Sequence, residues 1–125
     1  MTQVDVLHVR VRLLWTEAKT KDDKLDNQIT VDLAINRMTR LPVGKHPVFG
    51  IYGSPLRAEV YPFILQVDGT LDYGGNAGTG SDRFDSLNLL DRKVAIGELC
   101  TYESTQEEVC YRVESVVDPA TGNMC

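Results

Sequence analysis

The stretch QITVDLAI, residues 28–35, decides the fold class of this chain. Apolar side chains occupy every second position from Ile29 to Ile35, and the polar residues Thr30 and Asp32 stand between them. Successive side chains of a β-strand point to opposite faces, so this period of two predicts a strand with one buried face. A helix would instead repeat its apolar positions every three or four residues.

The segment before this stretch has the same alternation. In residues 4–15, apolar side chains occupy every second position from Leu7 to Leu13, and basic side chains lie on the other face. Residues 16–27, which are polar and charged, connect the two segments. We expect a hairpin with a long loop, in which a helical turn fits but has no apolar stripe to dock it.

Further strand signals follow along the chain. Asp68-Gly69, between apolar and β-prone residues, is a strong hairpin signal. Residues 81–91 hold the one predicted helix, with Ser81 as its N-cap. The predicted strands are 4–15, 28–35, 48–52, 58–67, 70–73, 92–103 and 108–117. Six or seven strands at short spacing predict a mostly β fold, an antiparallel sandwich or partly open barrel with at most one short helix at about 81–91.

The last hairpin has two registers that the sequence leaves open. If the turn centres on Thr105, Cys100 faces Cys110. If the turn consists of Thr105 and Gln106, Cys100 faces Tyr111. Cross-strand pairs contribute only ~0.2–1 kcal/mol each, so they do not choose between the registers.

Size and composition fit one domain. The chain has 125 residues, of which 42% are apolar and 25% charged, and typical domains span ~100–150 residues. We expect one β domain over residues 1–118 and a frayed tail over residues 119–125. Charges interrupt the apolar N-terminal segment, which argues against a signal peptide, and no apolar run approaches the ~20 residues of a membrane helix. Three cysteines without a C-x-x-C pair suit reduced thiols, so we expect a cytoplasmic location and no membrane association.

The net charge of −5 is unevenly distributed. Residues 1–62 hold nine Lys and Arg against seven Asp and Glu, whereas residues 63–125 hold four against eleven. Between residues 33 and 58 no acid occurs, and with His46 this segment forms a candidate anion- or partner-binding site, which we call the basic bend. Its members are Arg37, Arg40, Lys45, His46 and Arg57. The candidate acidic partner patch, which we call the acidic tip, consists of Glu103, Glu107 and Glu108.

The sequence contains no complete motif for cofactor binding, metal binding or nucleophilic catalysis. The glycine-rich stretch YGGNAGTGSD, residues 73–82, lacks the lysine of a P-loop, so we interpret it as a flexible loop. The acidic residues within 22–26 depart from the calcium-loop pattern because lysines interrupt them. No Ser or Cys in a recognisable nucleophile motif accompanies His8 or His46. We therefore expect no cofactor and no metal.

A nucleic-acid-binding barrel of this size would combine a positive groove with stacking aromatic side chains. Here the net charge is negative, and only Phe49 and Tyr52 lie near the basic bend in sequence. The sequence therefore argues against a nucleic-acid partner.

The favoured function is a non-catalytic protein-interaction or assembly module that acts through charged surface loops. Such a module is an oligomeric structural component or a partner that neutralises a basic protein. The basic bend and the acidic tip of neighbouring copies are natural mates for head-to-tail self-association. The alternative is a small-ligand binder or an enzyme whose site assembles near His46, in a loop held by a rigid sheet. The lack of a catalytic constellation weighs against an enzyme.

Overall fold

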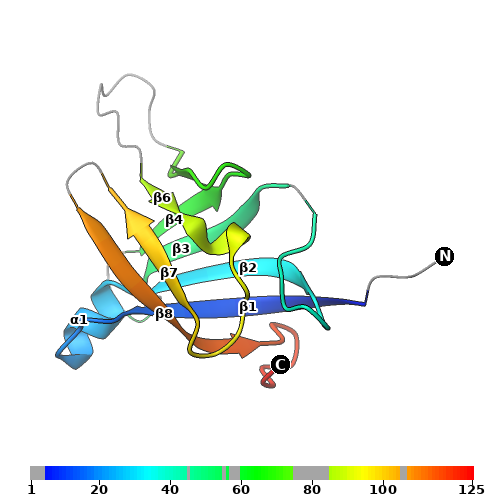
Figure 1. Ribbon diagram of the computed structural model, residues 1–125. Coiled ribbons are helices and arrows are strands. Elements are labelled where there is room, and N and C mark those ends of the chain that lie inside the picture. The colour runs from blue at the N-terminus through cyan, green and yellow to red at the C-terminus, as the bar shows by residue number, and fades with distance from the viewer. Residues whose placement is uncertain (1–4, 45, 55, 57–59, 75–84, 105–106) are drawn as a thin grey trace.

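The computed structural model describes residues 5–44, 46–54, 56, 60–74, 85–104 and 107–125. Within these ranges, eight antiparallel strands form one sheet that curls until it is nearly closed into a barrel (Figure 1). The predicted β class is confirmed, and the barrel is the predicted architecture that forms. The strand beyond the predicted number is β6, which lies where the sequence predicts a helix.

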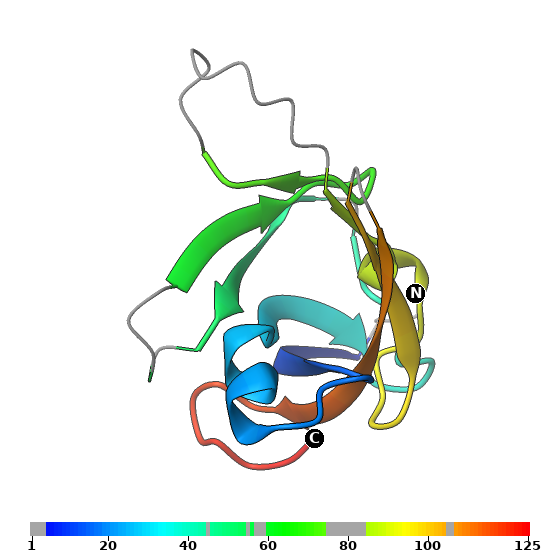
Figure 2. The ribbon, with the colours of Figure 1, turned by 90° about the vertical axis from the view of Figure 1, so that its left-hand side faces the viewer.

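The strands follow an up-and-down path. They are β1 Val6–Trp15, β2 Ile29–Asn36, β3 Val48–Gly53, β4 Val60–Leu65, β5 Leu71–Asp72, β6 Ser86–Leu87, β7 Leu99–Glu103 and β8 Glu108–Val117. Their order in the sheet is β5-β4-β3-β2-β1-β8-β7-β6, so that β8 returns to pair with β1. Figure 2 looks into the barrel from the end at which helix α1, Lys21–Asp26, lies.

Backbone hydrogen bonds join the two ends of the sheet. The amide of Leu71 donates to the carbonyl of Asp85, and the amide of Leu87 donates to the carbonyl of Gly69, each over 2.8 Å. Thr70 and the first residue of β6 form an isolated bridge at the same place. This seam covers edges that would otherwise present unpaired backbone groups.

Inward-facing side chains fill the barrel. The four apolar residues of β2 that alternate from Ile29 to Ile35 are all buried, as the sequence predicts. Strand β1 contributes Val9, Val11 and Leu13 to the same core. The remaining members of the core cluster are Val48, Phe63, Leu65, Leu71, Leu87, Leu89, Val94, Cys100, Tyr111, Val113 and Val116.

Strands β1 and β8 pair through a β-bulge. Arg12 faces Ser115 and Leu13 faces Val113, which leaves Glu114 as an extra residue on β8. A bulge of this kind places two successive residues on one side of the strand. Ser115 thereby joins the outer face next to Arg12.

Helix α1 lies in the connection over residues 16–27, where the sequence allows a helical turn, and not at the predicted position of about 81–91. Helix α1 follows Thr20, whose Oγ1 accepts a hydrogen bond of 3.0 Å from the amide of Asp23. None of its residues is buried, in keeping with the absence of an apolar stripe. An N-cap hydrogen bond contributes ~1 kcal/mol, which favours a short helix in this exposed connection.

The helix predicted at about 81–91 is wrong over its described part. Residues 86–87 form β6, and Asn88–Asp91 form a single 3₁₀ turn, while residues 81–84 lie outside the described residues. Leu87 and Leu89 are both fully buried. Pairing with β7 and the seam to β5 favours an extended chain here, and this tertiary contribution overrides the local helical pattern.

The C-terminal hairpin adopts the second of the two predicted registers. Cys100 faces Tyr111, and Glu103 faces Glu108. The tail after β8 folds back on the barrel, since the amide of Cys125 donates a hydrogen bond of 2.9 Å to the carbonyl of Val116. Fraying of the tail stays a prediction, as does the single-domain boundary at residue 118.

Candidate functional site

Four of the five residues of the basic bend lie between β2 and β3 in the sequence, and its two described arginines bind groups of the chain itself. The Nε atom of Arg37 lies 2.9 Å from Oδ2 of Asp5, and both side chains are more than half exposed. Arg40 donates from Nε to the carbonyl of Val94 over 3.1 Å and from Nη2 to the carbonyl of Cys125 over 3.3 Å. Arg40 therefore ties the bend to the β6–β7 connection and to the C-terminus.

Of the three other members of the basic bend, the structure describes only His46. His46 is exposed, and its imidazole lies over Gly44, where an added Cβ would come within 2.8 Å of Nδ1. In the described part of the chain, no carboxylate is bonded to His46. Lys45 and Arg57 lie outside the described residues. The described bend thus offers no His–carboxylate pair for acid–base chemistry.

The acidic tip is exposed at the turn between β7 and β8. Glu103 and Glu108 face each other across the two strands, and the amide of Ser104 donates to the carbonyl of Glu107 over 2.8 Å. Like charges that face each other repel. The β2–β3 connection, which holds Arg37, Arg40 and His46, and the acidic tip lie at opposite ends of the barrel (Figure 1), so that one copy cannot bring them together.

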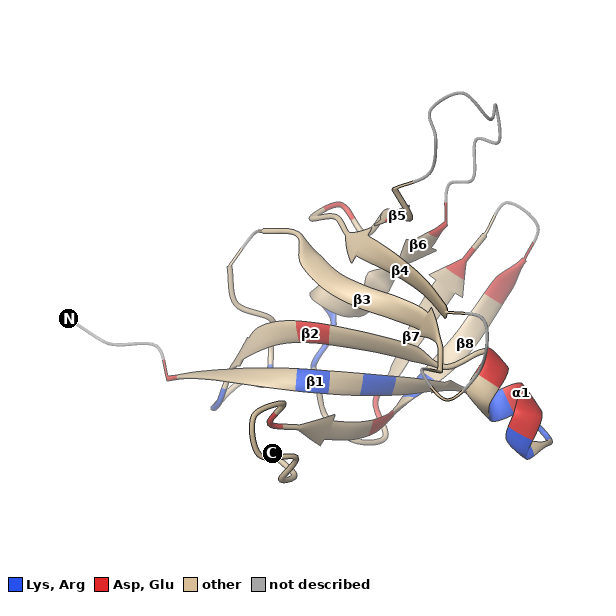
Figure 3. Cartoon of the chain, turned by 180° about the vertical axis from the view of Figure 1, so that it is seen from behind, with Lys and Arg blue, Asp and Glu red and all other residues tan. Residues whose placement is uncertain are grey.

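The outer wall of the barrel carries an uncharged surface, which is formed by β3 and β4. The twelve residues of β3 and β4 include no Lys, Arg, Asp or Glu (Figure 3). Phe49 faces Ile64 across the strands, and Ile51 faces Pro62. We call these four residues the outer panel. The side chains of Phe49 and Ile64 are 51% and 37% exposed, so the outer panel is an apolar surface in contact with solvent.

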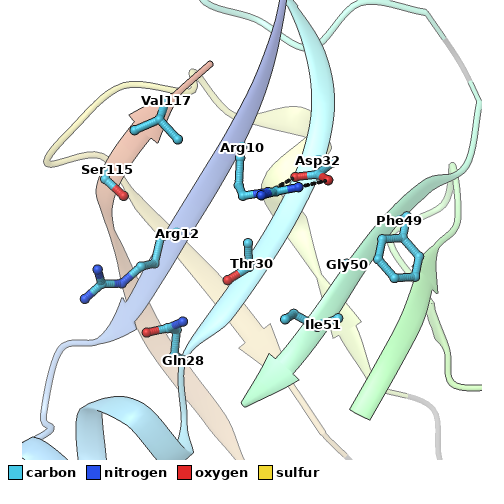
Figure 4. A pocket seen from close by; sticks show the side chains of 10 residues that line it. All are labelled: Arg10, Arg12, Gln28, Thr30, Asp32, Phe49, Gly50, Ile51, Ser115 and Val117. Atoms are coloured by element: carbon cyan, nitrogen blue, oxygen red, sulfur yellow. Dashed lines mark hydrogen bonds and ion pairs between the residues drawn. The ribbon is translucent and has the colours of Figure 1, made fainter. Parts of the chain in front are cut away.

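A groove of about 430 Å³ continues from the outer panel across β2, β1 and β8. Figure 4 shows its side chains in rows that follow the strands: Phe49 and Ile51 on β3, Thr30 on β2, Arg12 on β1 and Ser115 on β8. All belong to the outward face of the sheet. The bulge in β8 supplies Ser115 to this row.

The centre of the groove holds a bidentate ion pair. Nε of Arg10 lies 2.8 Å from Oδ1 of Asp32, and Nη2 lies 3.0 Å from Oδ2 (Figure 4). The two residues face each other on β1 and β2. The hydrogen bond to Asp32 and the charge of this carboxylate raise the pKa of Arg10. In the described part of the chain, Arg12 makes no such pair, which leaves it as the groove's available cation.

The outer panel, with the groove that continues from it, is not among the sites that the sequence predicts. Its signal was present: in the segments VFGIY and YPFIL, apolar residues occupy both faces of the predicted strands. A strand of an antiparallel sheet with one solvated face usually carries polar residues on that face. Apolar residues on both faces therefore mark a wall that another surface could cover.

Among the described residues, no group of three or more His, Cys, Asp or Glu side chains could hold a metal ion. No helix found in the described ranges has the length and apolar character needed to cross a membrane. Comparisons with protein-family models, with curated proteins and with solved structures found no match.

Proposed function

We propose that this chain is a non-catalytic assembly module that associates with a second copy of itself through the outer panel. The observation that carries the proposal is the uncharged, solvent-exposed apolar surface formed by β3 and β4. Single exposed apolar residues are common on proteins, whereas contiguous ones mark interaction sites. Covering Phe49 and Ile64 would remove apolar area from water, which contributes roughly 25 cal/mol per Å².

The distribution of charge favours a second copy as the occupant. Two chains with a net charge of −5 repel each other in general. The outer panel contributes no charge to this repulsion, so contact between the panels of two copies meets the least electrostatic repulsion. In a two-fold arrangement the same residues meet from both sides, and Phe49 and Ile64 of each copy would contact the panel of the other.

Head-to-tail contact between the basic bend and the acidic tip is a second route to assembly. Its support is the opposite charge of the two patches and the location of the β2–β3 connection and the acidic tip at opposite ends of the barrel. Arg37 and Arg40 already contact groups within their own chain, so a partner would have to compete for them. For this reason we place the outer panel first. The three free cysteines fit a reducing compartment such as the cytoplasm.

Light scattering on size-exclusion fractions over a wide range of protein concentrations tests the proposal. We expect the wild-type mass to rise from that of a monomer towards that of a dimer. Phe49→Glu and Ile64→Glu place a charge in the contact and should keep the protein monomeric. Leu99→Glu is the matched control, because Leu99 is also an exposed apolar strand residue, at 48% exposure, but lies on β7.

The salt dependence separates the two routes. Apolar contact should persist as salt is added, whereas contact between exposed charges should weaken, because charges are screened beyond a Debye length of ~8 Å at physiological ionic strength. Circular dichroism checks that each variant is folded. A wild type that stays monomeric at every concentration, or panel variants that dimerise like the control, would refute the proposal.

A further inference from the structure

A cluster of tyrosines occupies the end of the barrel near α1. Tyr52, Tyr102 and Tyr111 belong to β3, β7 and β8, and Tyr73 directly follows β5. The ring centroids of Tyr52 and Tyr102 are 6.0 Å apart, and those of Tyr102 and Tyr111 are 6.2 Å apart. The rings are tilted against each other by 49° and 56°. Strands far apart in the sequence thus bring several aromatic rings to one place.

A buried carboxylate lies beside this cluster. Asp85 directly precedes β6 and is only 4% exposed. Its Oδ2 accepts a hydrogen bond from the hydroxyl of Tyr102. Its Oδ1 is buried and has no hydrogen-bond partner among the groups that the structure describes. A buried carboxylate oxygen without a partner is costly, because burial removes the oxygen from the bulk solvent that stabilises its charge.

The hydroxyl groups of the cluster are held in fixed positions. Tyr111 donates to the backbone carbonyl of Asn27 over 2.7 Å, and Tyr52 donates to the side-chain oxygen of Asn27 over 2.9 Å. Burial, followed by the hydrogen bond to Asp85, raises the pKa of Tyr102, so this hydroxyl stays a donor at neutral pH. Three of the four tyrosines, Tyr52, Tyr73 and Tyr102, are partly exposed, which places the cluster at the border with solvent.

We propose that Asp85 and the tyrosine cluster form a binding site for a primary alkylammonium group. The ammonium would donate a hydrogen bond to Oδ1 of Asp85 and lie against the tyrosine rings. The negative face of an aromatic ring attracts a cation, and the attraction grows when the contact is removed from water. An N–H donor satisfies the unpartnered oxygen, whereas a quaternary ammonium has no hydrogen to donate. A metal ion fits less well, because the described residues provide no group of carboxylates, His or Cys for it.

Two sources could supply this group: a free small amine or the side chain of a lysine in a peptide. Both present an alkyl stem that packs on aromatic rings and a charged head that reaches the carboxylate. The proposal is independent of self-association through the outer panel, since none of the outer-panel residues belongs to the site.

The test uses n-butylammonium and a blocked lysine peptide as probes and n-butanol as the neutral control. We expect the amines to shift the NMR signals of the tyrosine rings and to raise the melting temperature, while butanol does neither. If n-butylammonium binds but the lysine peptide does not, the source is a small amine. If both probes bind, the lysine side chain of a protein partner can supply the group.

Asp85→Asn removes the charge but keeps the shape and an acceptor for the Tyr102 hydroxyl. This variant should lose at least tenfold in amine affinity, while Asp91→Asn, at an exposed carboxylate on the neighbouring turn, should bind like the wild type. Without amine, Asp85→Asn should be at least as stable as the wild type, because it lacks an unpartnered charge. No response to either amine, an equal response to butanol, or unchanged affinity in Asp85→Asn would overturn the proposal.

Discussion

The ring of Phe63 fills the space that a side chain on Gly50 would need. The two residues face each other on β3 and β4, and an added Cβ on Gly50 would lie 2.5 Å from Cζ of Phe63 and 2.8 Å from the carbonyl oxygen of Thr30. Phe63 is only 2% exposed. Gly50 lets this large ring enter the core. Because successive side chains of a strand point to opposite faces, Phe49 and Ile51, which flank Gly50, lie on the outer wall.

Gly50→Ala should therefore destabilise the protein. Overpacking of a close-packed core costs about 1–3 kcal/mol, although an alanine in a strand is otherwise favoured over glycine. We expect the free energy of unfolding, measured with urea, to fall by an amount in this range. In the double variant Gly50→Ala/Phe63→Leu, the smaller side chain relieves part of the clash, so the loss should be smaller than the sum of the single losses. Strictly additive losses would contradict this explanation.

The three thiols should differ in reactivity. Burial, followed by the nearby Cys110, raises the pKa of Cys100 to about 12, whereas Cys110 and Cys125 are exposed. Because the thiolate is the reactive form, alkylation of the native protein at pH 8 should modify Cys110 and Cys125 and spare Cys100. Mass spectrometry of peptides measures each site. Equal labelling of Cys100 in the native and the unfolded protein would show that this thiol is not protected.

Because the pKa of Cys100 is raised, the free energy of unfolding should fall at alkaline pH. Above its ordinary pKa of 9.0 the thiol of Cys100 loses its proton in the unfolded chain, but the folded chain keeps it until about pH 12. The unfolded state then binds fewer protons, so the free energy of unfolding falls as pH rises through this window, with a limiting slope of ~1.4 kcal/mol per pH unit.

Tyr102 and Tyr111, whose pKa values burial also raises, add to this loss at higher pH. Urea unfolding from pH 7 to pH 11 measures the effect. Cys100→Ala should show a shallower decline between pH 9 and pH 10, and a decline as steep as that of the wild type would contradict the role of Cys100.

The ion pair between Arg10 and Asp32 should contribute little stability in spite of its bidentate geometry. The two side chains are 48% and 37% exposed, and exposed pairs typically contribute ~0.2–1 kcal/mol. A double-mutant cycle with Arg10→Gln and Asp32→Asn should give a coupling energy in this range that decreases with added salt. A coupling that is insensitive to salt would show that the pair is shielded from solvent.

Alternation of apolar and polar residues along the chain predicts a strand of this barrel well where the strand and its neighbour in the sheet are both long. From Ile29 to Ile35 the period of two coincides with the buried face of β2, and the Asp68-Gly69 turn lies at the predicted place, with Gly69 at φ +93°. The pattern at 81–91 is misleading, because Phe84, Leu87 and Leu90 have the spacing of one helix face, while Leu87 and Leu89 have the spacing of one strand face. Only pairing with β7 and the seam to β5 decides between them, and this depends on residues distant in the chain.

The candidate sites depend even more on distant residues. Charge along the chain indicates the basic bend, but not that Arg40 would bind the carbonyls of Val94 and Cys125. Asp85 and Tyr102 are 17 residues apart and meet because β6 pairs with β7. The outer panel requires the pairing of β3 with β4, so the apolar residues on both faces of VFGIY and YPFIL indicate a continuous surface only once these two strands are known to be neighbours.

A dilution series followed by backbone NMR tests the central claim, self-association through the outer panel, most directly. We expect the amide signals of Phe49, Ile51 and Ile64 to shift with protein concentration, while those of Glu107 and Glu108 stay unchanged. Shifts at the acidic tip and at Arg37 instead would indicate head-to-tail contact through charge. Signals that do not depend on concentration anywhere in the chain would contradict self-association altogether.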